Sequence, residues 1–465
     1  MIKSFIGVFL LLICGYSLTL TIGGCAQIGN ITGGPKDTIA PILLKAEPAN
    51  RTTNFSGNKI VLNFDEYIEV RNISENVFVS PLQKNNPIIN YNFRTVSIKL
   101  RDTLLPNTTY TINFGKSLQD LNEGNPFEDF TYIFSTGDVI DSLSLEGKVF
   151  LAESGKTDST MIATLYRDLS DTAVQKKRPL YTAKVKPDGS FAFNNLPAGR
   201  FKLYALKDGD GGKTYNSKTE AFAFLDSTID VGESNPSLTL YAYEEVKNVP
   251  PVPGGTRTLA EKRLRYTTGL ISQRQDITQP LEITFNNPIK NFDEKRIVLL
   301  DTNLVSVSNL SFTSDSTRKK WQLKTTWLQD YDYTLVIPKD AVEDSTNNNL
   351  FKTDTLRFAT SKEEDYGSVV LRFKNIDLSK NPVIQFVSGE IVKFSFPVTA
   401  NQWSGKMFQP GEYELRILYD INQNGRWDPG NYATRLQPET AITLTQKISV
   451  RANWDNEVDV DLLRR

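Results

Sequence analysis

The sequence contains no histidine, and its only two cysteines, Cys14 and Cys25, lie near the N-terminus. Histidine is the usual general base of enzymes and a common zinc ligand. A chain without histidine cannot build a Ser-His-Asp or Cys-His catalytic site from its own residues. The chemistries that remain are carboxylate pairs, Ser-Lys pairs, tyrosine and hard metals such as calcium.

The chain also lacks an excess of charge of either sign. Its 53 basic and 54 acidic side chains leave a formal net charge of −1. Proteins that bind nucleic acid need a basic surface for the phosphate backbone, so we predict no nucleic acid partner. With 465 residues, of which 39% are apolar, the chain is long enough for three or four domains with separate cores.

The N-terminus has the layout of a secretory signal. Lys3 is followed by an apolar run over residues 5–14, which is too short to span a membrane as a helix, and then by small residues. The sequence "IGGC" ending at Cys25 resembles the bacterial lipobox, which implies cleavage before the cysteine and lipid on its sulfur. Residues 1–24 are then the signal peptide and residues 25–37 a flexible, lipidated tether.

Lipid on Cys25 would leave the mature chain without a free thiol or a disulfide. The next residue is Ala26 rather than an aspartate, so an inner-membrane retention signal of the enterobacterial type is absent. We therefore expect a protein anchored in the outer membrane through acylated Cys25, on either its periplasmic or its cell-surface face. The alternative is an ordinary signal peptide in which the cysteine is incidental.

Strand patterns dominate the rest of the chain. The segments "KIVLNF" (59–64), "TYTINF" (109–114) and "EYELRILY" (412–419) alternate apolar and polar residues. This period of two, with Gly, Pro, Asn and Asp between the runs, is typical of half-buried strands. Many short strands separated by turns predict β-sandwiches.

Two pairs of segments repeat along the chain. Residues 110–136 align with 333–360, and residues 196–216 align with 409–431. We predict an all-β fold of four tandem β-sandwich domains in the order A, B, A′, B′. The expected bounds are 38–138 for A, 139–246 for B, 247–259 for a Pro/Gly linker, 260–361 for A′ and 362–465 for B′.

The first half of the chain carries a family resemblance. The strand ending in "FDE", the segment "TTYTINF", and "DLNEGN" before "FSTGD" resemble the bacterial Ig-like domain at the front of Bacteroidota lipoproteins. The B segment "DGSFAFNNLPAGRFKLYALKD" looks like a prealbumin-like, carboxypeptidase-regulatory-type sandwich. The resemblance covers roughly residues 1–230, and it implies an architecture and a location rather than a reaction.

The loop "YDINQNGRWDPGNY" (419–432) concentrates oxygen-bearing residues around Gly425. Its paralogous loop in B holds Lys213 in place of this glycine, and a lysine opposes a divalent cation. A calcium site in B′ and a hydrogen-bonded turn both remain open. The expected calcium ligands are Asp420, Asn422, Asn424, the Arg426 carbonyl and Asp428.

Three further candidates come from single residues or short runs. Trp427 lies in this polar loop, where a tryptophan can stack on a sugar or anchor a protein partner. Thr38 lies in an Asp-Thr-Ile triplet that looks like the O-glycosylation acceptor of Bacteroidota. The carboxylates of "NFDEYIEV" and "DLNEGNPFED" could serve a glycosidase only at a defined separation. We expect them instead at solvated strand ends and turns.

These observations favour a non-catalytic, lipid-anchored outer-membrane scaffold, or an accessory subunit of a larger outer-membrane protein assembly. Its expected partners are the lipid bilayer, through Cys25, and an outer-membrane protein. The alternative is a surface carbohydrate-binding or adhesion lipoprotein. A carboxylate-based hydrolase is a third hypothesis. We predict no catalytic residue, and calcium is the only cofactor for which the sequence offers a candidate.

Overall fold

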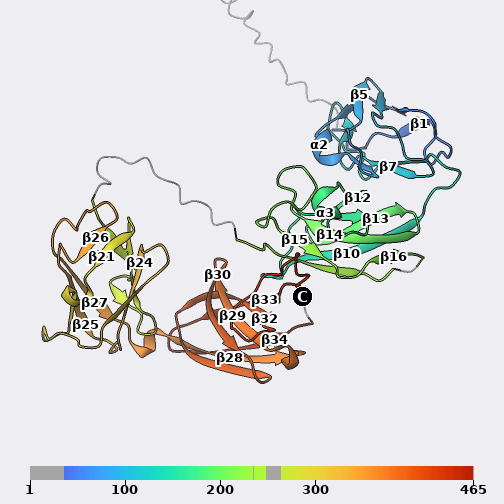
Figure 1. The fold of residues 1–465 in the computed structure, drawn as a ribbon. Helices are drawn as coiled ribbons and strands as arrows, with labels where there is room; N and C mark the ends of the chain where they lie inside the picture. Colours follow the sequence, from blue (N-terminus) through green and yellow to red (C-terminus); the bar gives the residue numbers. More distant parts are fainter. Residues whose placement is uncertain (1–35, 234, 248–262, 464–465) are drawn as a thin grey trace, which may run out of the picture. The chain divides into compact units, whose positions relative to one another are not determined.

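The computed structural model describes residues 36–233, 235–247 and 263–463 (Figure 1). The chain divides into two compact units, residues 1–79 with 83–140, and residues 80–82 with 141–465. The predicted all-β fold of tandem sandwiches is confirmed. Within the described ranges, no helix is long and apolar enough to cross a bilayer. Cys25 and most of the tether lie outside the described residues.

Domain A consists of three small sheets around one core. Their strand orders are β1-β2-β6-β5, β4-β7-β9 and β3-β8. The period of two has its expected effect, because Ile60, Leu62 and Phe64 of β2 are buried against the opposite sheet. The elements are β1 (Leu43–Glu47), β2 (Lys59–Phe64), β3 (Ile68–Val70), α2 (Ile73–Asn76), β4 (Phe78–Ser80), β5 (Ile88–Asn92), β6 (Thr95–Lys99), β7 (Thr109–Asn113), β8 (Leu118–Asp120) and β9 (Thr131–Ser135).

Domain B pairs a three-stranded sheet, β13-β10-β17, with a sheet in the order β12-β11-β14-β15, to which β16 adds through β14. Strands β10 and β17 run parallel. From Phe201 to Leu206, β14 is buried on both faces, so its outer face must also be covered. The elements are β10 (Leu143–Leu151), β11 (Ile162–Tyr166), α3 (Ala173–Lys176), β12 (Tyr181–Lys184), β13 (Ser190–Leu196), β14 (Gly199–Leu206), β15 (Phe222–Phe224), β16 (Ile229–Val231) and β17 (Leu238–Ala242).

Domain A′ contains the sheets β18-β20-β24-β23, β19-β27-β25-β22 and β21-β26 around its own core. The elements are β18 (Tyr266–Thr268), β19 (Arg274–Gln275), β20 (Leu281–Phe285), β21 (Ile289–Phe292), η2 (Glu294–Arg296), β22 (Val298–Leu300), β23 (Ser311–Ser314), β24 (Lys320–Lys324), β25 (Asp332–Ile337), β26 (Val342–Asp344) and β27 (Asp354–Thr360).

Domain B′ contains the sheets β31-β28-β34 and β30-β29-β32-β33, with β28 and β34 parallel. The elements are η3 (Glu363–Asp365), β28 (Gly367–Lys374), η4 (Leu378–Lys380), β29 (Pro382–Ser388), β30 (Ile391–Pro397), β31 (Gln402–Phe408), β32 (Gly411–Tyr419), β33 (Thr440–Val450) and β34 (Asp455–Asp461).

The two halves of the chain share their sheet orders. The sheet β1-β2-β6-β5 of A has the order of β18-β20-β24-β23 in A′, and β13-β10-β17 of B has that of β31-β28-β34 in B′. The parallel pair of B also recurs in B′. Corresponding residues can therefore be compared position by position, which separates what the fold needs from what one copy adds.

A buried aspartate holds the Asp/Asn-rich turn of both A and A′. Asp120 ends β8 with 1% of its surface exposed, and Asp344 ends β26 with 0%. Both carboxylates accept hydrogen bonds from backbone N–H groups of the turn that follows. The donors to Asp120 are Glu123, Gly124 and Asn125 at 2.6, 3.0 and 2.8 Å. The backbone donors to Asp344 are Thr346 and Asn348 at 2.8 and 2.9 Å.

We predict that Asp344→Asn destabilises A′ by about 2 kcal/mol at pH 7. Burial opposes ionisation of Asp344, but hydrogen bonds from Asn348, Asn287 and Thr346 outweigh it and lower its pKa to about 2. An unfolded aspartate titrates near ~3.9, so this stabilisation is complete above that pH and is lost as the pH falls towards 2.

Calorimetric unfolding at pH 7 and near pH 2 measures the effect, with exposed Asp332→Asn as the control. The gap between wild type and Asp344→Asn should close at the lower pH. An equal gap at both pH values would contradict the assignment.

Candidate functional site

Asp420 closes the turn that follows β32. It is 2% exposed, and its carboxylate accepts hydrogen bonds from the backbone N–H groups of Gly425 at 2.7 Å and Asn424 at 3.2 Å. In B, Asp208 accepts the N–H of Lys213 at 2.9 Å, also five residues further on. Gly425 and Lys213 both have left-handed backbones, with φ of 75° and 57°. The two loops therefore begin with the same turn.

Side-chain oxygens of Asn422, Asn424 and Asp428 also accept hydrogen bonds from N–H groups. The side-chain amides of Asn422 and Asn424 both donate to Asp428 Oδ2 at 2.6 Å. Their own Oδ1 atoms accept the backbone N–H groups of Asn424 and Arg426, at 3.1 and 2.7 Å. Calcium takes six to eight oxygen ligands. Calcium binding here would therefore have to displace these N–H donors.

No group of three or more acidic, histidine or cysteine side chains is placed to hold a metal anywhere in the described part of the chain. The calcium site at residues 420–428 stays a prediction. Titration calorimetry with Ca²⁺ on wild type and Asp420→Ala tests it, and heat in wild type alone would support it. Equal traces without heat would rule it out.

Trp427 covers the outer face of its own sheet. It lies seven residues after Asp420, as Tyr215 lies seven residues after Asp208. The Trp427 ring is half-buried and packs with a cluster of Val383, Leu418 and Ala441. Its Nε1 donates to the Glu439 carbonyl at 2.7 Å. The packing role follows from the repeat, while the predicted binding contact stays open.

Tyr432 is the principal residue that the sequence did not single out. It is 5% exposed, and its ring inserts into B within a set of aromatic side chains that we call the aromatic box. The centroids of Phe222 and Phe224 both lie 5.1 Å from that of Tyr432, close to the edge-on geometry that aromatic pairs favour. The aromatic box consists of Tyr204, Tyr215, Phe222, Phe224 and Tyr243.

Polar contacts hold Tyr432 at its hydroxyl and at its backbone N–H. The hydroxyl donates to the Asp171 carbonyl at 2.7 Å and lies 3.1 Å from the hydroxyl of Tyr204. The backbone N–H donates to Glu245 Oε1 at 3.1 Å. Burial raises the pKa of Tyr432, so its hydroxyl stays protonated and able to donate. A buried tyrosine needs such partners, because an unsatisfied hydroxyl is costly.

Residues after Tyr432 extend this interface. The Arg435 guanidinium lies over the Phe224 ring at 4.9 Å, and its Nη1 is 3.7 Å from Asp171 Oδ1. Gln437 Nε2 donates to the Phe224 carbonyl and to Asp226 Oδ2, both at 3.2 Å. The loop of B′ thus makes apolar, cation–π and hydrogen-bond contacts with B.

The start of β33 makes a second set of contacts with B. The N–H of Ala441 donates to the Ala152 carbonyl at 2.7 Å, and the Thr443 hydroxyl donates to a carbonyl in the same turn of B. Gly155 is required there, because a Cβ would lie 2.5 Å from the Ala441 carbonyl oxygen. Buried Arg416 adds a hydrogen bond from Nη1 to the Glu153 carbonyl at 3.2 Å. B and B′ therefore share an interface although A′ separates them in sequence.

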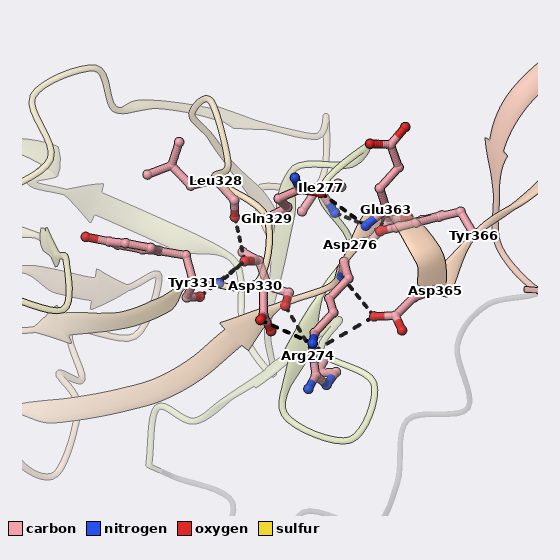
Figure 2. A network of polar contacts seen from close by, with 12 residues as sticks. Arg274, Asp276, Ile277, Leu328, Gln329, Asp330, Tyr331, Glu363, Asp365 and Tyr366 are labelled. Atoms are coloured by element: carbon pink, nitrogen blue, oxygen red, sulfur yellow. Dashed lines mark hydrogen bonds and ion pairs between the residues drawn. The ribbon is translucent and has the colours of Figure 1, made fainter. Parts of the chain in front are cut away.

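A polar network joins A′ to B′ (Figure 2). The Tyr366 hydroxyl donates to Asp276 Oδ1 at 2.6 Å and accepts the Ile277 N–H at 3.0 Å. Gln409 Nε2 donates to Asp276 Oδ2 at 2.7 Å. Tyr366 is 5% exposed, and burial together with its hydrogen bond to Asp276 raises its pKa. The network fixes the first residues of B′ against the loop after β19.

The remaining candidates lie in A. Thr38 is exposed, and the carboxylate of Asp37 accepts the Ile39 N–H at 2.9 Å. Its predicted glycosylation stays a prediction, which the intact mass of the protein from its host tests. Among the predicted carboxylates, burial and then the charges of Asp120 and Asp65 raise the pKa of Glu66. The two predicted runs lie side by side because β3 and β8 pair antiparallel, with Ile68 opposite Asp120.

Comparisons with known proteins agree with the Ig-like expectation for A. Residues 37–136 match the family described as bacterial Ig-like domain. A search of curated proteins found no match. Among solved structures, the chain is similar to domains MG0-NIE-MG1 of Escherichia coli α2-macroglobulin, with 16% identity, 41% of this chain, 73% of that chain and a TM-score of 0.21.

Two further structures are similar at lower identity. The Bacillus anthracis TIE protein is 11% identical over 92% of this chain and 75% of its own, with a TM-score of 0.17. BcpA, the major pilin subunit of Bacillus cereus, is 9% identical over 68% of this chain and 99% of its own, also with a TM-score of 0.17.

We predict that Tyr432→Ala separates B from B′ while each sandwich stays folded. Removing a buried aromatic anchor typically costs about 2–4 kcal/mol. Hydrogen exchange should rise at Ala441, whose N–H donates to the Ala152 carbonyl across the interface, and should stay unchanged in the core strands. Tyr432→Phe should show a smaller rise because it loses only the hydroxyl bonds. Trp454→Ala, an exposed tryptophan elsewhere in B′, is the control. Unchanged hydrogen exchange in Tyr432→Ala would refute the role of Tyr432 in holding B and B′ together.

Proposed function

We propose that this chain is a non-catalytic scaffold, or an accessory subunit of a larger outer-membrane protein assembly, held by lipid on Cys25. The main observation in support of this proposal is the insertion of Tyr432 into the aromatic box. A contact that joins sandwiches across an intervening domain limits their relative motion, as a scaffold requires and as an enzyme does not specifically need. We infer a lipoprotein of the Bacteroidota type from the lipobox and the Ig-like domain.

The use of the polar loops supports this proposal. One aspartate in each of the four sandwiches accepts a backbone N–H group of the turn that follows it: Asp120 in A, Asp344 in A′, Asp208 in B and Asp420 in B′. Each accepts backbone N–H groups, which uses the lone pairs that a catalytic carboxylate would offer to a substrate. The loops therefore contribute to architecture.

A recess beside Trp427 favours the alternative of carbohydrate binding. It has a volume of about 480 Å³, and buried Gln385 and Arg416 lie in its lining. Arg416 Nε has no hydrogen-bond partner among the described residues. Glu153, Glu244 and Glu245 balance Lys247, Arg416 and Arg426 in the lining, so a neutral, hydroxyl-rich ligand suits it better than an ion.

We predict that Cys25→Ser moves the protein from the membrane to the soluble fraction of its native host. Wild type should incorporate a labelled fatty acid, and the variant should not, because the acyl chain attaches to the cysteine sulfur. Crosslinking followed by purification from outer membranes should recover a protein partner with wild type. An unlabelled wild type would refute the anchor, and recovery of monomer alone would refute the accessory-subunit role.

The carbohydrate alternative makes a separate prediction. Immobilised maltohexaose, cellohexaose and mannohexaose, as neutral probes, should include one that retains wild type. Trp427→Ala and Arg416→Gln should each weaken that binding by about tenfold or more, by removing the stacking face or the unpaired donor. Trp454→Ala should bind normally. Retention on none of these probes, or equal binding by Trp427→Ala, would refute this alternative.

A further inference from the structure

Domain A exposes a group of large apolar side chains that we call the N-terminal apolar patch. Tyr67 and Phe93 form its centre, with ring centroids 5.8 Å apart. Leu121 lies beside them, since its N–H donates to the Tyr67 carbonyl at 2.9 Å. Large exposed apolar groups mark contact surfaces more often than chance. The patch consists of Ile42, Tyr67, Tyr91, Phe93 and Leu121, whose exposed fractions are 56, 46, 45, 69 and 51%.

The duplicated domain A′ provides a control for the Phe93 position. The Phe93 carbonyl accepts the N–H of Ile68 at 2.8 Å, and in A′ the Arg318 carbonyl accepts the N–H of Ile289 at 2.9 Å. Both residues have a left-handed backbone, with φ of 53° and 55°. The same turn therefore carries phenylalanine in A and arginine in A′.

The other patch positions also become polar or lose their large side chain in A′. The N–H of Ile42 donates to the Asp65 carboxylate, and that of Arg265 donates to the corresponding Asn286. The Leu121 N–H corresponds to the Ser345 N–H, which donates to the carbonyl of Pro288 as Leu121 donates to Tyr67. The substitutions from A to A′ are thus Ile42 to Arg265, Tyr67 to Pro288, Phe93 to Arg318 and Leu121 to Ser345.

Because A′ keeps the same backbone hydrogen bonds with these other side chains, the fold does not need the apolar patch. Tyr91 follows the same trend: it pairs with Val96, and Ser314 pairs with the corresponding Trp321 in A′. The patch is therefore specific to A, the copy that directly follows the tether. A surface present in one copy alone fits a contact that only this copy can make.

We propose that the N-terminal apolar patch rests on the headgroup region of the lipid bilayer. The proposal builds on the lipid anchor at Cys25. Only 16 residues lie between Cys25 and Ile42, and a chain of this length spans no more than about 60 Å even when fully extended. The anchor thus keeps the patch within about 60 Å of the bilayer.

The chemistry of the patch suits a lipid interface. Tyrosine and other amphipathic aromatics are enriched at the level of the headgroups. The Arg94 guanidinium lies 5.7 Å from the Tyr67 ring centre, where it can also reach a lipid phosphate. Arg71 is paired with Glu69 at 2.7 Å, and Asp65 and Glu66 lie on the other side of Tyr67 in sequence. With acids beside it, the patch fits zwitterionic lipid, and its binding should depend little on salt.

Vesicle binding by the unlipidated chain tests the proposal without relying on the anchor. Residues 25–465 with Cys25→Ser contain no cysteine, so one added cysteine gives one labelling site. An environment-sensitive dye at Asn92→Cys should shift to the blue with phosphatidylcholine vesicles, at low and high salt alike. The same dye at Thr313→Cys, in the corresponding hairpin of A′, should not respond.

Exchanging residues between the copies gives matched variants. Ile42→Arg, Phe93→Arg and Leu121→Ser together place the A′ residues in A, where the fold should accept them, and should lower vesicle partition by about tenfold or more. The reciprocal set, Arg265→Ile, Arg318→Phe and Ser345→Leu, should make the label at residue 313 respond. Melting curves check that both variants are folded.

A label at residue 92 that ignores vesicles, or equal partition by the exchange variant, would overturn the proposal. Normal vesicle partition by the exchange variant, combined with loss of a crosslinked protein from native membranes, would assign the patch to a protein partner instead. Because no lipidated protein is used, failure of the Cys25 anchor in the host and failure of the patch on vesicles are separate results.

Discussion

The packing of B′ against B centres on one aromatic side chain, that of Tyr432. Its ring is edge-on to rings of B, and its hydroxyl and backbone N–H find acceptors there. Each aromatic pair contributes about 0.5–1.5 kcal/mol beyond area burial. Because B and B′ belong to one chain, the contact forms without the entropy loss of bringing separate molecules together. The loop that carries Tyr432 also positions Trp427 and part of the lining of the recess beside it.

Equivalent strands of B and B′ contribute different side chains to this interface. Position 204 in B and position 416 in B′ lie at the same distance from the aspartate that follows the strand, Asp208 or Asp420. B has tyrosine there and forms the aromatic box, whereas B′ has Arg416, which donates to a carbonyl of B. The same strand thus contributes to the aromatic box in B and carries a buried cation in B′. The faces of B and B′ that meet are therefore complementary rather than identical. A and A′ show the same principle, since equal turns carry apolar residues in one copy and polar residues in the other.

Much of this fold follows from local sequence patterns. The alternation of "KIVLNF" identifies its buried face, and the repeated spacing from Gly199 to Asp208 and from Gly411 to Asp420 identifies two equivalent strands and their turns. Trp427 packs partly on its own sheet, as its counterpart Tyr215 indicates, and its binding contact stays a prediction. The calcium pattern was ambiguous because Asp and Asn oxygens at alternate positions serve a turn as well as a metal.

The interface itself could not be predicted in this way. Tyr432 lies in the part of the B′ loop that has no counterpart in the aligned repeat, and a contact between non-consecutive domains leaves no periodic signal. The apolar patch of A was equally hidden, because its residues come from separate strands and turns. Only the hydrogen-bond register of A and A′ shows that Phe93 and Arg318 occupy one position. Local physics therefore predicts the sandwiches, while their mutual contacts depend on three-dimensional packing.

The most direct test of the account is the distance between B and B′ in solution. Spin labels at exposed Lys186→Cys and Lys447→Cys, in residues 25–465 with Cys25→Ser, report it by double electron–electron resonance. The account predicts a single narrow distance distribution in wild type that broadens when Tyr432 is replaced by alanine. A broad distribution in wild type, or one that the replacement leaves unchanged, would contradict it.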